Sequence, residues 1–176
     1  MKKSFIDQYK SIIKTCLTPN EIHNKVEHIH LESLYQKGYK SLLLDVDNTL
    51  IPYSIKKVPL EIVNWIEKNK QLGFDIYLVS NNSSKRRIDT VAKQLDVEAR
   101  YFTLKPFTFS LTDLANKKNI DLSQSIIIGD QLFKDVIAGN WVNAYTIWVE
   151  PIDKRTSFFK TIQRDIELKI VSLLDS

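Results

Sequence analysis

Four aspartates and one lysine in this sequence together suggest chemistry on a phosphate group. The stretch SLLLDVDNTLIPY begins as an apolar run and then places Asp45 and Asp47 two residues apart, while Asp130 and Asp135 stand together in GDQLFKD. Lys105 lies between these pairs in the sequence and precedes a proline. Carboxylate oxygens bind a hard cation such as Mg²⁺, and the cation together with a lysine neutralises phosphoryl oxygens.

Asp45 and Asp47 are close enough along the chain to act on the same substrate. A carboxylate beside a metal ion can attack phosphorus as a nucleophile, and a second one can protonate the leaving oxygen. The alternative is a turn or a helix cap. Acids at the end of a buried strand are costly unless cations compensate their charge, so we expect a metal ion and Lys105 to do so.

The pattern of apolar residues predicts strands that alternate with helices. The expected strands are 41–46, 74–79, 100–103, 125–129 and 144–149, and the expected helices are 60–71, 84–95, 108–118 and 132–139. Alternation of this kind is typical of right-handed βαβ units and a mainly parallel sheet. We therefore expect an α/β fold of three layers, similar to the Rossmann type.

These strands would bring the polar residues to one edge of the sheet. Asp45 and Asp47 follow the first strand, Ser80 follows the second, Lys105 follows the third and Asp130 follows the fourth. In an open parallel sheet, ligands bind outside the carboxyl ends of the strands, where the strand order reverses. The sequence therefore predicts that these side chains form one site.

At this point the motifs resemble a known family. DVDNT, SNN, KP and GDQLFKD occur in the order of the four motifs of the haloacid dehalogenase superfamily. The pattern is most similar to the YqeG-type, class IIIA phosphatases, which are related to mitochondrial phosphatidylglycerophosphate phosphatases. The similarity runs from about Pro19 to Ile152. It implies a haloacid dehalogenase fold and a phosphomonoester hydrolase.

The resemblance also implies roles for individual residues. Asp45 would be the nucleophile that forms an aspartyl-phosphate, and Asp47 the general acid and base. Thr49 would support this loop beside the substrate, and Ser80 and Asn81 would bind the phosphate. For Ser80 the alternative from the residues alone is a turn former.

The same resemblance implies a Mg²⁺ site. Asp45, Asp130 and the backbone carbonyl of Asp47 would bind the metal, with Asp135 as a direct or water-mediated ligand. Lys105 would hold both the nucleophile and the phosphate. A helix cap is the alternative for Asp135, and a solvated side chain is the alternative for Lys105.

The chain departs from the family pattern at one place. Where the family usually shows a GNRxG-like stretch, this chain reads Gly139-Asn140-Trp141-Val142-Asn143, so arginine and glycine are replaced by Trp141 and Asn143. The core chemistry does not depend on these positions, whereas a local substrate contact does. We expect Trp141 and Trp148 to pack in the core or at an edge.

The length of 176 residues predicts one domain, residues 1–176. Residues 1–37 are expected to form a helical lead-in, and residues 153–176 a C-terminal docking helix. The intervals 47–80 and 80–105 are too short for a separate cap domain, which needs at least ~50 residues. An uncapped site can accept a large or surface-bound substrate.

Composition narrows the functional class further. One cysteine excludes an internal disulfide framework, and 43% hydrophobic with 26% charged residues is an ordinary globular balance. The net charge of +4 suits an anionic partner. No apolar run approaches the ~20 residues of a membrane span, so we expect a cytoplasmic protein, with peripheral contact at the inner face of the membrane.

Basic and amphipathic segments bear on that membrane contact. Residues 4–17 carry an apolar helical face that would lie in a membrane interface or pack on the domain itself. Residues 85–87 are three consecutive basic residues, either a solvated helix face or an attraction for an anionic substrate. His23, His28 and His30 lack the spacing of a metal site, and we expect them to be structural or exposed.

The leading substrate is phosphatidylglycerophosphate, which rests on the resemblance and on the missing cap. Anionic lipid is then the expected partner, and no nucleic acid is expected. Two alternatives stay open. The first is a phosphatase of a soluble or protein phosphate, and the second is a binding partner of a GTPase or ribosome factor in which turnover is incidental.

Overall fold

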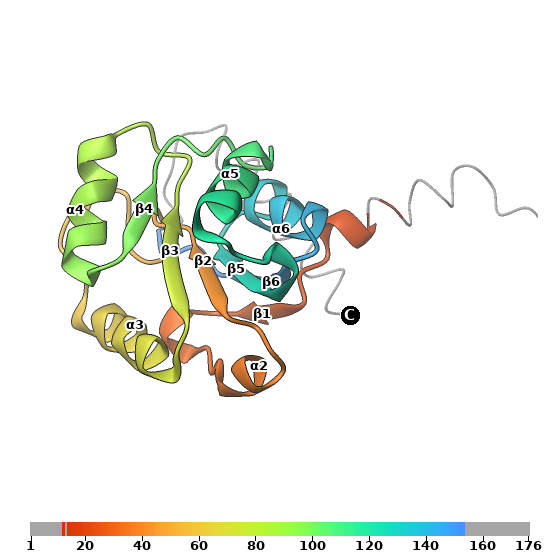
Figure 1. Ribbon diagram of the computed structural model, residues 1–176. Coiled ribbons are helices and arrows are strands. Elements are labelled where there is room, and N and C mark those ends of the chain that lie inside the picture. Colours follow the sequence, from red (N-terminus) through yellow and green to blue (C-terminus); the bar gives the residue numbers. More distant parts are fainter. Residues whose placement is uncertain (1–11, 13, 154–176) are drawn as a thin grey trace, which may run out of the picture.

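All six strands of the central sheet run parallel, in the order β1-β6-β5-β2-β3-β4 (Figure 1). The computed structural model describes residue 12 and residues 14–153. The strands are β1 (Glu21–His23), β2 (Ser41–Leu44), β3 (Asp75–Val79), β4 (Glu98–Arg100), β5 (Ser125–Gly129) and β6 (Tyr145–Val149). The chain extends the sheet from β2 to β3 and β4 on one side, and then to β5 and β6 on the other. The strand order therefore reverses beside β2, where ligands bind in such sheets.

Helices cover both faces of this sheet (Figure 1). They are α2 (Glu32–Gln36), α3 (Leu60–Leu72), α4 (Lys85–Leu95), α5 (Phe109–Lys118) and α6 (Ile137–Trp141), with short turns at Val26–His28 and Leu122–Gln124 and one wide helical turn, η3 (Leu132–Val136). Leu42 and Leu44 pack with the helices α3 and α4, whereas Leu43 packs with α5 and α6. Successive residues of a strand point to opposite faces, so β2 is buried on both sides. The predicted three-layer α/β fold is confirmed.

The observed boundaries differ from the predicted ones in a few places. The predicted strand 100–103 is found earlier, as β4, and residues 101–103 begin the following loop. The predicted helix 132–139 is divided into η3 and α6. Each connection between successive strands from β2 to β5 contains one α-helix with loops, and the described residues there include no separate cap domain. No helix within residues 14–153 is long and apolar enough to cross a membrane.

The predicted helical lead-in is wrong at β1, which forms an edge strand beside β6. Its three residues are too few to show a strand periodicity in the sequence. Contacts with β6 hold the strand in place: Asn20 Oδ1, just before β1, accepts hydrogen bonds from Thr146 N at 2.8 Å and from Thr146 Oγ1 at 3.0 Å. His23 lies in this strand against Glu21, whereas His28 and His30 are exposed. The predicted C-terminal helix and most of the segment 4–17 lie outside the described residues.

Two glycines with a left-handed backbone allow a matched test of the packing of Tyr35 against the end of α3. Gly73 ends α3 with φ of 103°, and a Cβ there would lie 2.5 Å from Tyr35 Oη, whereas Gly38 has φ of 102° and nothing within 4 Å. Alanine strains the backbone at both sites, but only Gly73→Ala displaces Tyr35. We expect Gly73→Ala to lower the free energy of unfolding by about 2–3 kcal/mol and Gly38→Ala by about 1–2 kcal/mol. Urea denaturation measures both, and equal losses would contradict the role given to Tyr35.

Candidate active site

Asp45 lies directly beyond β2, at the reversal of strand order. Its backbone N–H donates to Ile128 O at 2.9 Å, which continues the pairing with β5. Its side chain is buried, and Thr49 Oγ1 donates to Asp45 Oδ2 at 3.2 Å and to Asp130 Oδ1 at 3.4 Å. Asn48 turns the chain between them with φ of 68°. The structure thus brings Asp45, Thr49 and Asp130 together as the sequence predicts.

Lys105 is the cation in the middle of this site. Its Nζ donates to Asp45 Oδ1 at 2.9 Å, to Asp135 Oδ1 at 2.6 Å and to Val79 O at 2.6 Å. Only 3% of Lys105 is exposed, so this ammonium group has exchanged water for three protein acceptors. Burial alone would lower the pKa of Lys105, but the nearby charges of Asp135 and Asp45 outweigh it and raise that pKa. The lysine is held as a cation.

The side chain of Asn81 holds the backbone that carries this lysine. Asn81 Nδ2 donates to Lys105 O at 2.8 Å, and Asn81 Oδ1 accepts from Lys105 N at 2.7 Å and from Thr103 Oγ1 at 2.8 Å. Ser80 is buried beside it, and its Oγ accepts from Asn82 N at 3.1 Å. Ser80 and Asn81 therefore lie at the predicted edge. Their side chains support the loop, and their binding of phosphate stays a prediction.

Asp47 belongs to a second polar group, which sequence reasoning missed. Asn82 Nδ2 donates to Asp47 Oδ2 at 2.7 Å, and Arg87 Nε and Nη2 both lie 2.8 Å from Asp47 Oδ1. Arg87 also donates to Pro52 O at 3.0 Å and to Ile55 O at 2.6 Å, in the segment after Asp47. The sequence offered one signal: Arg87 is in the first turn of the helix that follows the SNN motif. The first turn of a helix after a parallel strand lies at the carboxyl edge of the sheet.

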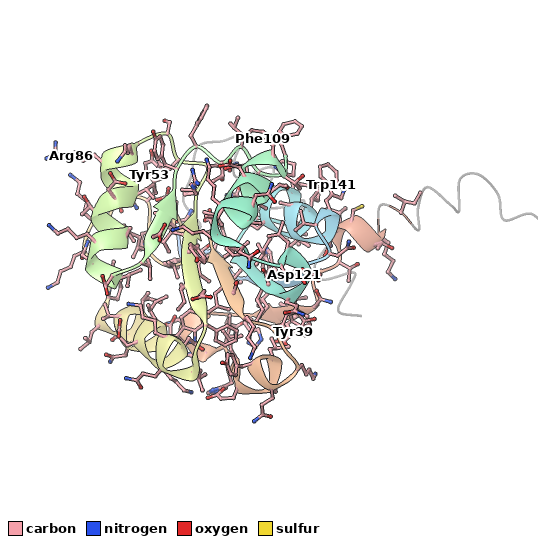
Figure 2. The ribbon with its side chains drawn as sticks, viewed as in Figure 1. Tyr39, Tyr53, Arg86, Phe109, Asp121 and Trp141 are labelled. Atoms are coloured by element: carbon pink, nitrogen blue, oxygen red, sulfur yellow. The ribbon has the colours of Figure 1, made fainter. Side chains whose placement is uncertain are left out.

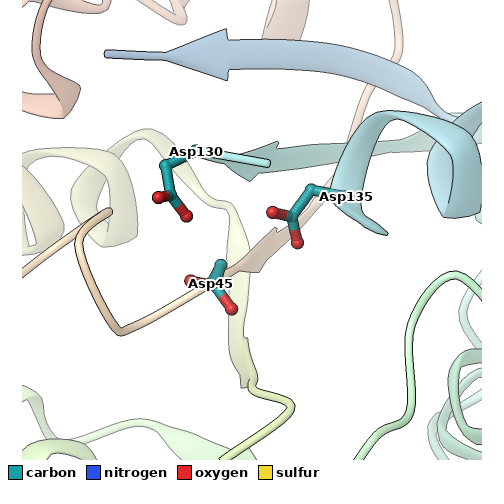
Figure 3. Close-up of side chains that lie close together, drawn as sticks. All are labelled: Asp45, Asp130 and Asp135. Atoms are coloured by element: carbon teal, nitrogen blue, oxygen red, sulfur yellow. The ribbon is translucent and has the colours of Figure 1, made fainter. Parts of the chain in front are cut away.

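Three of the acids could hold a cation. One carboxylate oxygen from each of Asp45, Asp130 and Asp135 lies within 4.8 Å of the others, and Figure 3 shows the three groups close together beyond the ends of β2 and β5. Their three negative charges against the one positive charge of Lys105 leave a balance of minus two when all are ionised. Burying that charge is costly, and a divalent cation with oxygen ligands would neutralise it. The residues therefore fit the predicted Mg²⁺.

Gly129 makes the close approach of Asp135 to β5 feasible. A Cβ on Gly129 would lie 2.2 Å from Asp135 Cγ, which no side chain tolerates. Gln131 N donates to Asp135 Oδ2 at 3.1 Å, and Trp148 Nε1 donates to Asp130 O at 2.8 Å. The buried Trp148 therefore packs in the core, as predicted, and also holds the motif that bears two of the acids.

Burial raises the pKa of Asp45 to about 6. The ammonium of Lys105 opposes this shift, while the charges of Asp135 and Asp47 add to it. Proton and metal ion would therefore compete for Asp45 in mildly acidic solution.

The departure from the family pattern has a structural explanation at one of its two positions. Asn143 has φ of 57°, a left-handed conformation that glycine adopts easily and asparagine tolerates better than most residues. Asn140, whose position agrees with the family, donates from Nδ2 to Cys16 O at 2.8 Å and Thr18 O at 3.1 Å. Trp141 is 54% exposed, so the prediction that it packs in the core is wrong, whereas packing at an edge stays a prediction.

Comparisons with known proteins agree with this geometry. The sequence pattern of the family described as mitochondrial PGP phosphatase matches residues 9–152. The probable phosphatase YqeG of Bacillus subtilis (strain 168) is 28% identical over 163 residues, which cover 93% of this chain and 94% of that protein. The chloroplastic/mitochondrial phosphatidylglycerophosphate phosphatase 1 of Arabidopsis thaliana is 30% identical over 157 residues, which cover 83% of this chain.

The chain spans only 44% of the length of the Arabidopsis protein. The crystal structure of an uncharacterized protein from Listeria monocytogenes serotype 4b matches with a TM-score of 0.53 at 18% identity, over 77% of this chain and 98% of that one, and this likeness concerns the fold alone. With the family pattern matched over most of its length, the chain belongs to the mitochondrial PGP phosphatase family and is a phosphatase.

Proposed function

We propose that this phosphatase is Mg²⁺-dependent, forms an aspartyl-phosphate on Asp45, and acts on phosphatidylglycerophosphate. The observation that carries the proposal is the environment of Asp45. This carboxylate is buried at the reversal of strand order, Lys105 contacts one of its oxygens at 2.9 Å, and two more acids lie within 4.8 Å. Two acids and a cation around a third acid suit the transfer of a phosphoryl group better than they suit a structural ion pair.

Asp45 serves as the nucleophile in the first step. One of its oxygens attacks phosphorus, the bond from phosphorus to the ester oxygen breaks, and the leaving oxygen takes a proton. Lys105 keeps the attacking carboxylate in place and offsets the negative charge that the phosphate brings. In the second step water attacks the same phosphorus, the bond between phosphorus and Asp45 breaks, and inorganic phosphate leaves.

Asp47 moves the proton in both steps. It takes a proton from the attacking water in the second step, and this is the proton that it gives to the leaving oxygen in the first step of the next turnover. Its side chain is 18% exposed against 8% for that of Asp45, so it lies nearer to solvent and to an entering substrate. Asn82 and Arg87 engage both of its oxygens, which holds the proton-accepting form in one orientation.

Asp45, Asp130 and Asp135 would hold the Mg²⁺ ion, with the backbone carbonyl of Asp47 as the further predicted ligand. When bound, the ion supplies positive charge for the phosphoryl oxygens and orients the phosphate. The balance of minus two on the buried side chains supports a divalent rather than a monovalent ion.

Family membership and the uncapped architecture support a lipid substrate. The Arabidopsis relative is named for phosphatidylglycerophosphate, and the described residues of this chain include no cap that would enclose a small metabolite. A lipid headgroup can then reach Asp45 while its acyl chains stay in a bilayer or micelle.

The first prediction tests the nucleophile and the substrate together. Asp45→Asn keeps the shape of the side chain but removes the attacking charge, so we expect phosphate release to fall by roughly a thousandfold or more with an unchanged fold. Wild-type protein should hydrolyse phosphatidylglycerophosphate in mixed micelles faster than glycerol 3-phosphate at equal concentration. Phosphate release and circular dichroism measure these effects.

Two outcomes would contradict different parts of the proposal. Wild-type turnover by Asp45→Asn on a chromogenic phosphomonoester would refute the covalent mechanism. If the protein cleaves a soluble phosphate rapidly but does not hydrolyse phosphatidylglycerophosphate, the proposed lipid substrate is refuted and the soluble-phosphate alternative is favoured.

The second prediction concerns Mg²⁺ and pH. Folding raises the pKa of Asp45 from its ordinary value of 3.8 to about 6. The ionisation of Asp45 therefore lowers the stability of the folded state as the pH rises through this range. At pH 7.5 Asp45 is ionised and ready to bind, whereas at pH 5 Mg²⁺ must displace a proton. Saturating Mg²⁺ should therefore raise Tm by roughly 5–10 °C at pH 7.5 and by much less at pH 5.

Matched variants make this measurement specific. Asp130→Asn should remove most of the rise in Tm, while Asp89→Asn, which changes an exposed acid on α4, should keep it. A Tm that is indifferent to Mg²⁺ at both pH values would argue against a metal site at these residues.

The third prediction concerns Arg87. Arg87→Ala removes the cation and the donors that orient Asp47, and it releases the carbonyls of Pro52 and Ile55. We expect kcat on a soluble chromogenic ester to fall roughly tenfold to a hundredfold. Lys93→Ala removes an exposed positive charge from the same helix and should leave kcat within about twofold. Equal kcat values for the two variants would show that Asp47 does not depend on Arg87.

A further inference from the structure

Exposed apolar side chains gather in the loop that carries Lys105. Five large apolar residues in the segment 101–109 are between 38% and 63% exposed, and together they are called the docking rim: Tyr101, Phe102, Leu104, Phe107 and Phe109. Single exposed apolar residues are ordinary on a protein surface, but five within nine residues concentrate exposed apolar area in one loop. Exposed apolar area in the loop that carries a site residue indicates a surface that meets a partner.

The loop exposes its apolar residues and buries its polar ones. Thr103 and Lys105 are almost completely buried, while their neighbours Phe102 and Leu104 are exposed. Phe102 N donates to Asn82 O at 2.9 Å and Thr103 N donates to Ser80 O at 3.0 Å, which ties this arrangement to the end of β3. The rim is therefore attached to the two neighbours of Asn81, the residue that positions Lys105.

The backbone of the rim is strained as well. Phe102 has φ of 52° and Leu104 has φ of 56°, left-handed values that are unfavourable for bulky residues. Strain of this kind persists where the surroundings impose it. Here it keeps two apolar side chains in solvent on either side of Thr103.

Basic residues border the rim. Segments 80–87 and 101–109 contain four basic and no acidic residues, and two of the four, Lys85 and Arg86, are exposed. Lys85 Nζ, which also pairs with Asp89, lies 5.9 Å from the centre of the Tyr101 ring. Arg86 is exposed on α4, and Figure 2 shows it on the outer side of that helix, with Tyr53 and Phe109 at the same upper end of the molecule.

The combination of aromatic and basic side chains indicates which kind of partner this surface meets. Aromatic side chains beside lysine and arginine are typical of surfaces that lie in the headgroup region of an anionic membrane. We propose that the docking rim, with Lys85 and Arg86 beside it, rests on an anionic lipid bilayer and presents a lipid phosphate headgroup to Asp45. The inference rests on the lipid substrate proposed above and adds the surface that meets the membrane.

Vesicle binding by the full chain tests this inference without using its enzymatic activity. Sedimentation with vesicles of phosphatidylglycerol and phosphatidylcholine is compared between the wild type and the double variant Phe107→Ser, Phe109→Ser. We expect partitioning of the double variant to fall at least tenfold, and partitioning of the wild type to weaken as salt rises. Turnover of a soluble chromogenic ester by the double variant should stay within about twofold, which shows that its fold is intact.

Leu60→Ser is the matched control. Leu60 is 68% exposed, and it follows Val58, whose N–H donates to Gln94 near the distal end of α4. This variant loses a comparable exposed apolar side chain away from the rim, so it should partition as the wild type does.

Three results would overturn the docking rim. They are wild-type partitioning of the double variant, no partitioning of the wild type, and a wild-type dimer in gel filtration that the double variant abolishes. The last would make the rim a contact between two copies of the chain. A failure of the proposed substrate can be told apart from a failure of the docking rim. Cleavage of phosphatidylglycerophosphate in detergent micelles tests the substrate, and binding to vesicles that lack this lipid tests the rim.

Discussion

The ammonium group of Lys105 is the element on which the rest of the site depends. It lies between the carboxylate of Asp45, directly beyond β2, and that of Asp135, in the turn η3 that follows β5, and it offsets part of the cost of burying them. Without it, two negative charges would be buried next to each other at the carboxyl edge of the sheet. Asn81 fixes the backbone of the lysine, and Gly129 leaves room for Asp135. These two residues are therefore as necessary to the site as the groups that carry its charge.

The two acids of the DVDNT motif lie only two residues apart but in different surroundings. Asp45 belongs to a buried group whose balance is minus two, and Asp47 belongs to a neutral pair with Arg87 nearer to solvent. Different surroundings allow two chemically identical side chains to serve different roles, as the division between a nucleophile and a proton carrier requires. The separation also explains why a cation fits beside Asp45 and why Arg87 suffices beside Asp47.

Loops, rather than an additional domain, determine what reaches Asp45. The segment after Asp47 is tied to Arg87, and the segment after β4 is tied to Ser80, Asn81 and Asn82. Both loops are thereby fixed to the end of β3 and the start of α4. An open entrance with fixed walls suits a substrate whose bulk remains outside the protein, because only the phosphate has to enter.

The sequence by itself determined the sheet, its layers and the position of the acids. Leu42, Leu43 and Leu44 indicate a strand buried on both faces, and the alternation of strands with helices brings every strand end to one edge. Both signals are local, and four short motifs in order added the roles that the resemblance implies for Asp45 and Lys105. Tertiary structure decided what local signals do not contain. Which way Arg87 points depends on how α4 docks on the sheet, and β1 exists because β6 is there to pair with it. That Asn81 holds Lys105 and that Asn143 can replace a glycine follow from backbone geometry between distant segments, which no periodicity in the sequence reports.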